Sequence, residues 1–152
     1  MKHLKVGDDA PYFEGMTDKN ETVKLTDFRG KKLALFFYPA ANTPTCTTEA
    51  CNLRDHYQEL KDKGIAVLGV SPDSVKKQAN FSKKFAFPYD LLADTELTVL
   101  SAYGVWGPKK FMGREFDGVH RMTFLIDEAG KIAQIIDNVV SANHAAQLLA
   151  LV

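Results

Sequence analysis

The chain contains two cysteines, Cys46 and Cys51, and both lie in the segment FFYPAANTPTCTTEACNLRD at residues 36–55. Within it, Thr43 and Pro44 form a favourable helix start, because threonine can cap free backbone N–H groups and proline at the first helical position loses no hydrogen bond. This register predicts that Cys46 lies in the first turn of the helix. The helix dipole favours an anion there, and the thiolate is the nucleophilic form of cysteine. The segment therefore predicts a reactive thiol at Cys46.

The position of Cys51 on the same helix predicts a conformational change if the two cysteines pair. On an ideal helix, Cys51 lies about 140° around and about 7.5 Å along from Cys46, so their Cα atoms are roughly 8–9 Å apart. This separation exceeds the roughly 7 Å that a disulfide allows. The segment should therefore be helical when both thiols are reduced and locally unwound when they are joined. The alternative is that both cysteines are small buried hydrophobic residues with no redox role.

The histidines do not combine with these cysteines into a metal site. Structural zinc requires a tetrahedral set of ligands in closely spaced pairs, whereas this chain offers two sulfurs five residues apart and four scattered histidines. We expect His3, His56 and His144 to be surface residues, and we assign no role to His120. The sequence thus predicts no metal site.

The elements that flank the cysteine segment predict an α/β fold. Continuous apolar runs within residues 31–39 and 64–73 are typical of strands that are buried on both faces of a parallel sheet. A helix with apolar side chains at helical spacing lies between them: Ala50, Leu53, Tyr57 and Leu60. A strand, a helix and a strand in this order form a βαβ unit with a right-handed crossover.

The remaining elements complete a mixed sheet with helices on its faces. We expect helices over residues 74–85, 96–104 and 141–152, the last with Ser141 as its N-cap. We expect a short strand over residues 90–94, a β-hairpin arm around residues 22–25, and a hairpin of RMTFLID and KIAQIID joined by Glu128-Ala129-Gly130.

The composition argues against nucleic-acid and membrane partners. The chain has 152 residues with 19 basic and 19 acidic side chains, and phosphate binding needs a basic excess on one face. No apolar run approaches the roughly 20 residues that cross a bilayer, and residues 1–9 lack the apolar core of a signal peptide. We therefore expect a cytoplasmic protein. In a reducing compartment, a lone cysteine pair is more often catalytic, redox-sensing or metal-binding than structural.

The pattern P-x-x-x-T-x-x-C, formed by Pro39, Thr43 and Cys46, resembles the active-site signature of the peroxiredoxins. The string FYPAANTPTCTTEACNLRD is similar to the peroxiredoxin Q type, also called the bacterioferritin comigratory protein type. The similarity continues through GVWGPKKFMGREFDGVHRMTFLID at residues 104–127 and covers nearly the whole chain. It implies a thioredoxin-like fold, with a central mixed β-sheet flanked by helices, in one domain over residues 1–152.

The resemblance implies a thiol-specific peroxidase that acts on hydrogen peroxide and alkyl hydroperoxides without a metal or an organic cofactor. Cys46 resembles the peroxidatic cysteine, whose thiolate attacks peroxide and becomes a sulfenic acid. Cys51 resembles the resolving cysteine, which condenses with the sulfenic acid to give an intramolecular disulfide. Thioredoxin or a similar dithiol reductant then reduces this disulfide by thiol exchange. A monomer is expected, because resolution occurs within one chain.

The resemblance also assigns roles to residues that carry no such signal alone. Thr43 resembles the threonine whose hydroxyl bonds peroxide and thiolate, and Pro39 resembles the proline that shields the cysteine from water. Arg121 resembles the arginine that approaches the sulfur and stabilises charge in the transition state. Without the resemblance, Arg121 is a surface residue at a strand end. Glu49 either orients this arginine or is a solvated helix residue.

Several positions leave the substrate preference open. Trp106, Phe111 and Phe116 either line an apolar wall for organic hydroperoxides or, as we favour, pack in the core. The chain has Thr45 where glycine is frequent in the family and Pro108 where an acidic residue is common. Neither change removes a catalytic group.

Two other classes of function are compatible with a cysteine pair on this fold. A thiol–disulfide oxidoreductase usually carries C-x-x-C, which this chain lacks, and requires neither Thr43 nor Arg121. A redox-sensing holdase would react slowly with peroxide and would bind a partner through the unwound segment. The signature around Cys46, together with the later arginine, favours the peroxidase.

Overall fold

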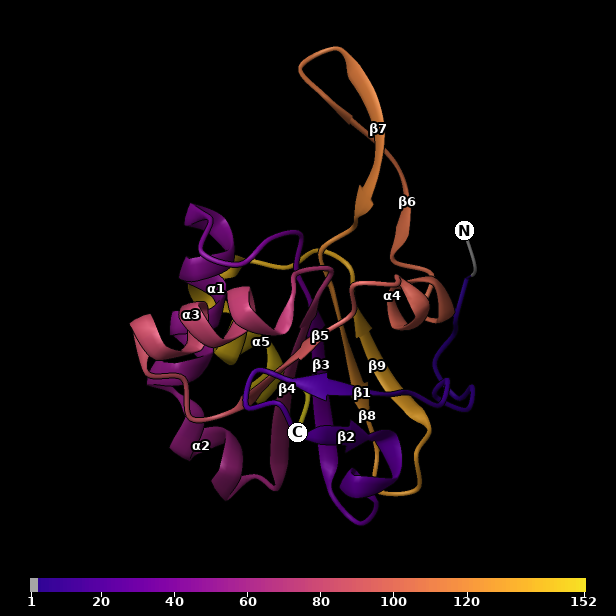
Figure 1. Cartoon of the computed structure of the whole chain (residues 1–152). Helices are drawn as coiled ribbons and strands as arrows, with labels where there is room; N and C mark the ends of the chain where they lie inside the picture. Colours follow the sequence, from indigo (N-terminus) through magenta and orange to yellow (C-terminus); the bar gives the residue numbers. More distant parts are fainter. Residues whose placement is uncertain (1–2) are drawn as a thin grey trace.

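A seven-stranded sheet forms the centre of the computed structural model, which describes residues 3–152 (Figure 1). Its strands lie in the order β2-β1-β5-β4-β3-β8-β9. Their bounds are β1 Glu14–Thr17, β2 Thr22–Lys24, β3 Lys32–Phe37, β4 Ile65–Ser71, β5 Asp90–Ala93, β8 Met122–Ile126 and β9 Ile132–Ile136. The neighbours β3, β4 and β5 run parallel, and the outer pairs are antiparallel. The predicted mixed sheet and both predicted hairpins are confirmed.

The central strand β3 is buried on both faces, as its apolar sequence predicts. Leu33, Leu35 and Phe37 belong to the core cluster on one face, and Ala34 and Phe36 belong to the cluster on the other. This alternation follows from the two-residue period of a strand. The strand that leads to the cysteine segment is therefore fixed from both sides.

Helices cover both faces of the sheet. They are α1 Pro44–Asp55, α2 Tyr57–Asp62, α3 Val75–Phe85, α4 Thr98–Ala102 and α5 His144–Leu149, with short 3-10 helices η1 Leu25–Phe28 and η2 Ser141–Asn143. The helices α1, α2, α3 and α5 contribute to the core cluster on one face, and α4 contributes to the other. Figure 1 shows α1, α3 and α5 gathered on the same side of the sheet. None of the helices in residues 3–152 is both long and apolar enough to cross a membrane.

Two helix predictions are corrected by the structure. The helix between β3 and β4 is divided at His56 into α1 and α2. The final α-helix starts at His144 instead of Ser141, because residues 141–143 form the 3-10 turn η2. That turn brings the Ala142 carbonyl oxygen within 2.9 Å of Asn52 Nδ2 on α1. Ser141 is therefore not the N-cap, and the tertiary contact sets where the helix begins.

A third hairpin, β6 Trp106–Phe111 and β7 Arg114–Val119, was not predicted. It projects from the body of the molecule (Figure 1). Its turn residues, Met112 and Gly113, have φ values of 52° and 77°, the conformation that a tight two-residue hairpin turn requires. The strands are mostly exposed, so they lack the buried face that produces a strand pattern in the sequence.

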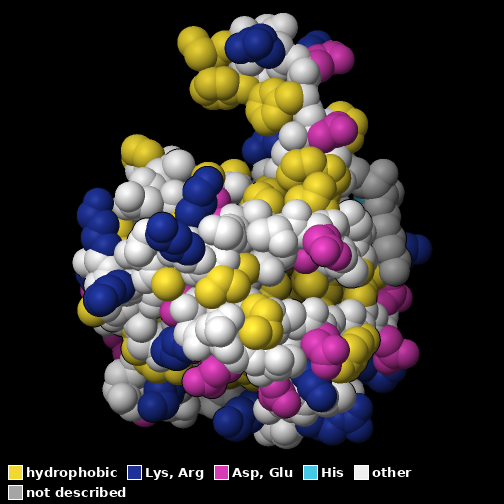
Figure 2. Space-filling model, in the orientation of Figure 1, with side chains coloured by type: hydrophobic (Ala, Val, Ile, Leu, Met, Phe, Trp, Pro, Cys, Tyr) yellow, Lys and Arg dark blue, Asp and Glu magenta, His cyan; other side chains and the backbone are white. Residues whose placement is uncertain are grey.

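The hairpin carries exposed aromatic side chains, which contradicts the core-packing interpretation for two of the three. Phe111 is 66% exposed and Phe116 is 47% exposed, whereas Trp106 is partly buried against the core. Figure 2 shows hydrophobic side chains gathered on the projecting arm, and Met112 at its turn is 86% exposed. These side chains lie outside the core because the arm extends beyond the central sheet.

Candidate active site

The start of α1 presents the Cys46 thiol. The helix begins at Pro44, and the backbone of Thr43 is extended, so Cys46 is in the first turn as predicted. Its side chain is buried. The Thr43 hydroxyl does not cap the helix, because it donates to the Ala40 carbonyl oxygen at 2.9 Å. The predicted side-chain cap is wrong, but the dipole of α1 still favours a negative charge at the first turn.

The loop before α1 is hydrogen-bonded to residues at the C-terminal end of β4 and directly after it. The Ala41 N–H donates to Asp73 Oδ2 at 2.7 Å, and the Ser71 hydroxyl donates to the same oxygen at 2.7 Å. The buried Gln78 side chain on α3 donates to Ser71 Oγ at 2.8 Å. Pro39 lies half-buried at the start of this loop. These bonds fix the path of the chain from β3 into the reactive helix.

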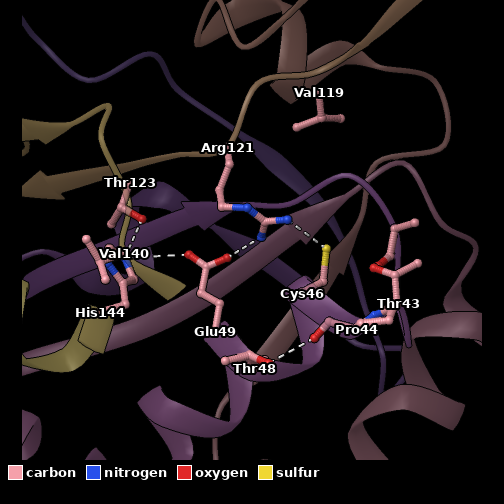
Figure 3. A network of polar contacts seen from close by, with 12 residues as sticks. Thr43, Pro44, Cys46, Thr48, Glu49, Val119, Arg121, Thr123, Val140 and His144 are labelled. Atoms are coloured by element: carbon pink, nitrogen blue, oxygen red, sulfur yellow. Dashed lines mark hydrogen bonds and ion pairs between the residues drawn. The ribbon is translucent and has the colours of Figure 1, made fainter. Parts of the chain in front are cut away.

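Arg121 joins the thiol to a buried carboxylate. It lies directly before β8, and its side chain reaches α1 (Figure 3). Its Nη2 donates to Cys46 Sγ at 3.3 Å, and its Nη1 donates to Glu49 Oε1 at 2.6 Å. The structure thus brings together Cys46 and Arg121, two of the predicted site residues. It also supports the orienting interpretation of Glu49 over the solvated one, because Glu49 is completely buried.

The ionisable groups of this cluster influence one another. Burial raises the pKa of Glu49 to about 7, and the opposing effect of Arg121 does not cancel it. Burial tends to lower the pKa of Arg121, but Glu49 and Cys46 outweigh it and raise that pKa. Arg121 therefore stays a cation beside the sulfur, while Glu49 is poised to gain or lose a proton near neutral pH.

A second cation, Lys109 on β6, lies near the same site and was not predicted. Its Nζ donates to the Val119 carbonyl oxygen at 2.7 Å. Burial lowers the pKa of Lys109, Arg121 lowers it further, and Cys46 acts in the opposite direction. The projecting hairpin therefore contributes charge to the surroundings of the thiol.

The structure corrects the prediction for one histidine. His144 is completely buried, whereas we expected it at the surface; His3 is exposed and His56 is partly exposed. His144 Nε2 lies 2.7 Å from the Thr123 hydroxyl and 3.6 Å from Glu49 Oε2. The available sequence signal was that His144 and the apolar Leu148 are four residues apart and so lie on one helical face.

Cys51 lies on α1 with Cys46, as the spacing predicted. Both cysteines are free thiols; Cys46 is buried and Cys51 is half-buried. Burial raises the pKa of Cys51, although Arg54 opposes this effect. In the reduced form, the Cys51 thiol is therefore a neutral group that packs against the core.

The described part of the chain offers no cluster of three or more His, Cys, Asp or Glu side chains that could hold a metal ion. The polar groups around Cys46 are instead a guanidinium, a carboxyl group and an imidazole (Figure 3). Of these groups, the guanidinium contacts the sulfur and can stabilise an anionic sulfur and charge that develops on a neighbouring oxygen.

Comparison with known proteins identifies relatives over nearly the full length. Residues 6–135 match the AhpC/TSA family. The chain is 49% identical over 144 residues to a putative peroxiredoxin Bcp of Haemophilus influenzae, which covers 95% of this chain and 93% of the relative. It is 46% identical over 144 residues to peroxiredoxin Bcp of Escherichia coli K12, with 95% and 92% covered.

Solved structures agree with this similarity. The crystal structure of peroxidoxin BcpB from Mycobacterium tuberculosis superposes with a TM-score of 0.86 at 35% identity and covers 98% of this chain and 96% of that one. Trapped intermediate and ligand complexes were used to study alkyl peroxide reduction by the Xanthomonas campestris bacterioferritin comigratory protein. One such structure superposes with a TM-score of 0.85 at 33% identity and covers 91% of this chain and 88% of that one.

Proposed function

Because the chain belongs to the AhpC/TSA family, as a thiol peroxidase of the peroxiredoxin Q or Bcp type, we propose that Cys46 is the residue that peroxide oxidises. The Cys46 thiolate attacks one oxygen of the hydroperoxide. An S–O bond forms and the O–O bond breaks, so the sulfur is oxidised to a sulfenic acid. The leaving oxygen takes a proton and departs as water or an alcohol.

The observation that carries this proposal is the Arg121 guanidinium between Cys46 Sγ and Glu49 Oε1, at 3.3 Å and 2.6 Å. A cation held at this distance stabilises the thiolate and the charge that develops on the peroxide oxygen. The bond to Glu49 fixes one guanidinium nitrogen and leaves the other facing the sulfur. Neither a disulfide oxidoreductase nor a holdase requires this arrangement.

We propose that Thr43 and Pro39 complete the substrate site. Thr43 precedes the reactive helix, and its hydroxyl donates to Ala40, which leaves its oxygen lone pairs available to a peroxide O–H. Pro39 is half-buried where β3 enters the loop and limits water around the sulfur. Hydrogen peroxide and alkyl hydroperoxides both fit this chemistry, because each offers the O–O bond that the thiolate attacks.

Cys51 is proposed to resolve the sulfenic acid as an intramolecular disulfide. It is the other cysteine of the chain and lies on the same helix as Cys46. Since ideal helical geometry keeps the two Cα atoms roughly 8–9 Å apart, the first turns of α1 must unwind before the bond forms. Thioredoxin or a similar dithiol would then restore both thiols. This cycle is complete within a monomer, and a cytoplasmic location provides the reductant.

The test is stopped-flow mixing of the reduced protein with a stoichiometric amount of hydrogen peroxide, followed by intact-mass measurement of the quenched product. We expect oxidation far faster than that of free cysteine thiolate and a product that has lost the two thiol hydrogens. Cys46→Ser should abolish the reaction while the fold is retained. Cys51→Ser should react once and stop at the sulfenic acid.

Three results would each contradict a part of the proposal. If the rate matches that of free thiolate, the surroundings of Cys46 do not activate peroxide. If Cys46→Ser still turns over, the assignment of the nucleophile is wrong. Loss of the first oxidation in Cys51→Ser would show that Cys51 does more than resolve the intermediate.

A further inference from the structure

The buried His144 has no role in the reaction described so far, yet it faces the carboxyl group that holds Arg121. Both Glu49 and His144 have 0% exposed surface. Glu49 Oε1 accepts from Arg121, and Oε2 lies 3.6 Å from His144 Nε2. Within residues 3–152, Oε2 has no hydrogen-bond partner although it is buried. A buried polar atom without a partner is costly and calls for a physical explanation.

The hydrogen bonds of Gln147 determine which ring nitrogen of neutral His144 carries the proton. Gln147 Oε1 accepts from the Val140 N–H at 3.0 Å, and Gln147 Nε2 donates to the Asn138 carbonyl oxygen at 3.0 Å. The same Oε1 lies 2.8 Å from His144 Nδ1. Because an amide oxygen can only accept, Nδ1 must carry a hydrogen. In neutral His144, Nε2 is then an acceptor, and the Thr123 hydroxyl donates to it.

This tautomer places two acceptors against each other. His144 Nε2 and an ionised Glu49 Oε2 then both lack a hydrogen, so neither atom can donate to the other across the 3.6 Å between them. One added proton removes the repulsion between these acceptors: on His144 Nε2 it supplies a donor that Oε2 accepts once the 3.6 Å separation shortens slightly, and on Glu49 it removes the negative charge. The two side chains therefore bind a proton as a pair, whose titration belongs to neither residue alone.

The charges around the pair connect this proton to the state of the sulfur. The groups that face it are the Arg121 guanidinium, the Cys46 thiol and the Tyr89 hydroxyl, which donates to the Ala50 carbonyl oxygen; Lys109 lies beyond Arg121. With Cys46 as a thiolate and Arg121 as a cation, a protonated pair makes the buried cluster neutral. With Cys46 as a sulfenic acid, an ionised Glu49 beside Arg121 makes it neutral.

We propose that Glu49 and His144 share one proton while Cys46 is a thiolate and release it when peroxide oxidises the sulfur. Because Glu49 holds Arg121, His144 acts on Arg121 through Glu49 and is a positioning residue. The inference rests on the proposed role of Cys46. Burial supports it in two ways, because it raises the pKa of Glu49 to about 7 and lowers the pKa of His144. The pair then releases its proton in the same step in which the leaving oxygen of the peroxide takes up a proton.

The proton balance of the first oxidation follows directly. The thiolate sulfur loses two electrons to the O–O bond, and hydroxide leaves from hydrogen peroxide. This hydroxide takes a proton and becomes water. If the pair releases its proton in the same step, the solution loses almost none; if it does not, the solution loses about one proton per thiolate oxidised.

The experiment measures this balance in the Cys51→Ser background, where the reaction stops at the sulfenic acid. The reduced protein is mixed with hydrogen peroxide in weak buffer near neutral pH, and a pH-indicator dye records proton uptake. The thiolate content is measured on the same sample by ultraviolet absorbance, and intact mass confirms the oxidation. The variants are His144→Gln and Glu49→Gln. Glutamine at position 144 gives Glu49 a donor that does not titrate, so it keeps the carboxylate ionised.

We expect proton uptake near zero in the parent and about one per thiolate in both variants. Leu148→Ala is the matched control, because it loosens the buried face of α5 but leaves both members of the pair in place, and it should behave as the parent does. Equal uptake in the parent and His144→Gln would overturn the inference, as would a change of equal size in Leu148→Ala. If Glu49→Gln alone changes the uptake, Glu49 holds the proton without His144. If the parent is not oxidised at Cys46, it is the proposed function that fails.

Discussion

Replacing Glu49 with glutamine should change how the stability of the reduced protein depends on pH. In the folded protein, burial raises the pKa of Glu49 from its ordinary value of 4.5 to about 7. The folded state therefore binds this proton more tightly than the unfolded state. Its contribution to the free energy of unfolding is complete below the unfolded pKa and is lost as pH rises through about 7. Since one pKa unit corresponds to about 1.4 kcal/mol, the whole contribution is about 3 kcal/mol.

Glutamine cannot titrate, so the variant lacks this pH-dependent loss. We expect the stability of Glu49→Gln relative to the parent to rise by about 3 kcal/mol between roughly pH 4.5 and pH 8. Glutamine keeps a side-chain oxygen that can accept from Arg121 but never carries the negative charge. The attraction between Arg121 and the ionised carboxylate is already included in the pKa of about 7, so the change of the difference with pH measures the titration of Glu49.

The assay is urea unfolding of both reduced proteins across this pH range, with the free energy extrapolated to water. Glu128→Gln is the control, because Glu128 is exposed and its carboxyl group is solvated in both states. If the difference between Glu49→Gln and the parent stays constant with pH, Glu49 does not change its charge over this range, and the expected change in stability is wrong.

Three further variants test other parts of the structure. Arg121→Lys keeps the charge but loses the guanidinium fork, so stopped-flow oxidation of Cys46 should slow by roughly tenfold; an unchanged rate would show that charge alone suffices. Thr43→Val removes the hydroxyl at nearly constant volume and should slow the same step, whereas Thr43→Ser should retain it; equal rates would exclude a role for the hydroxyl. Ala86 ends α3 with φ at 53° and is exposed, so Ala86→Gly should stabilise the protein by about 0.5–1 kcal/mol in urea unfolding, and a loss of stability would contradict this account.

The sequence predicts best those elements whose pattern is produced by burial. The strands β3 and β4 are continuous apolar runs because both of their faces are covered, and Thr43-Pro44 marks the start of α1 within one residue. The β6–β7 hairpin was not predicted because its strands are exposed, and exposed strands need no apolar alternation. The Met112-Gly113 turn was the local signal for it, since glycine readily adopts positive φ.

The residues of the candidate site also fall into two groups, those that the local sequence predicts and those that it does not. The position of Cys46 follows from local helix geometry, whereas the role of Arg121 came only from the resemblance to a family. Arg121 and Glu49 are 72 residues apart in sequence, and no local pattern reports that distance. The burial of His144 was missed because a single histidine beside small apolar residues fits a surface helix equally well. Such contacts depend on how the sheet brings α1, β8 and α5 together.

The distribution of side-chain size along α1 is compatible with the unwinding that the proposed Cys46–Cys51 disulfide requires. Its first turns bury only the small Cys46 and Ala50 together with the polar Glu49, whereas the large Leu53 is buried near its C-terminal end. Because the hydrophobic contribution grows with the apolar area removed from water, unwinding the first turns sacrifices little of it. The contacts that oppose unwinding are mainly polar, and the bond from Arg121 to Cys46 is one of them. In the proposed cycle, oxidation of the sulfur removes the charge that strengthens this bond, so the proposed reaction would itself weaken a contact that opposes unwinding of this segment.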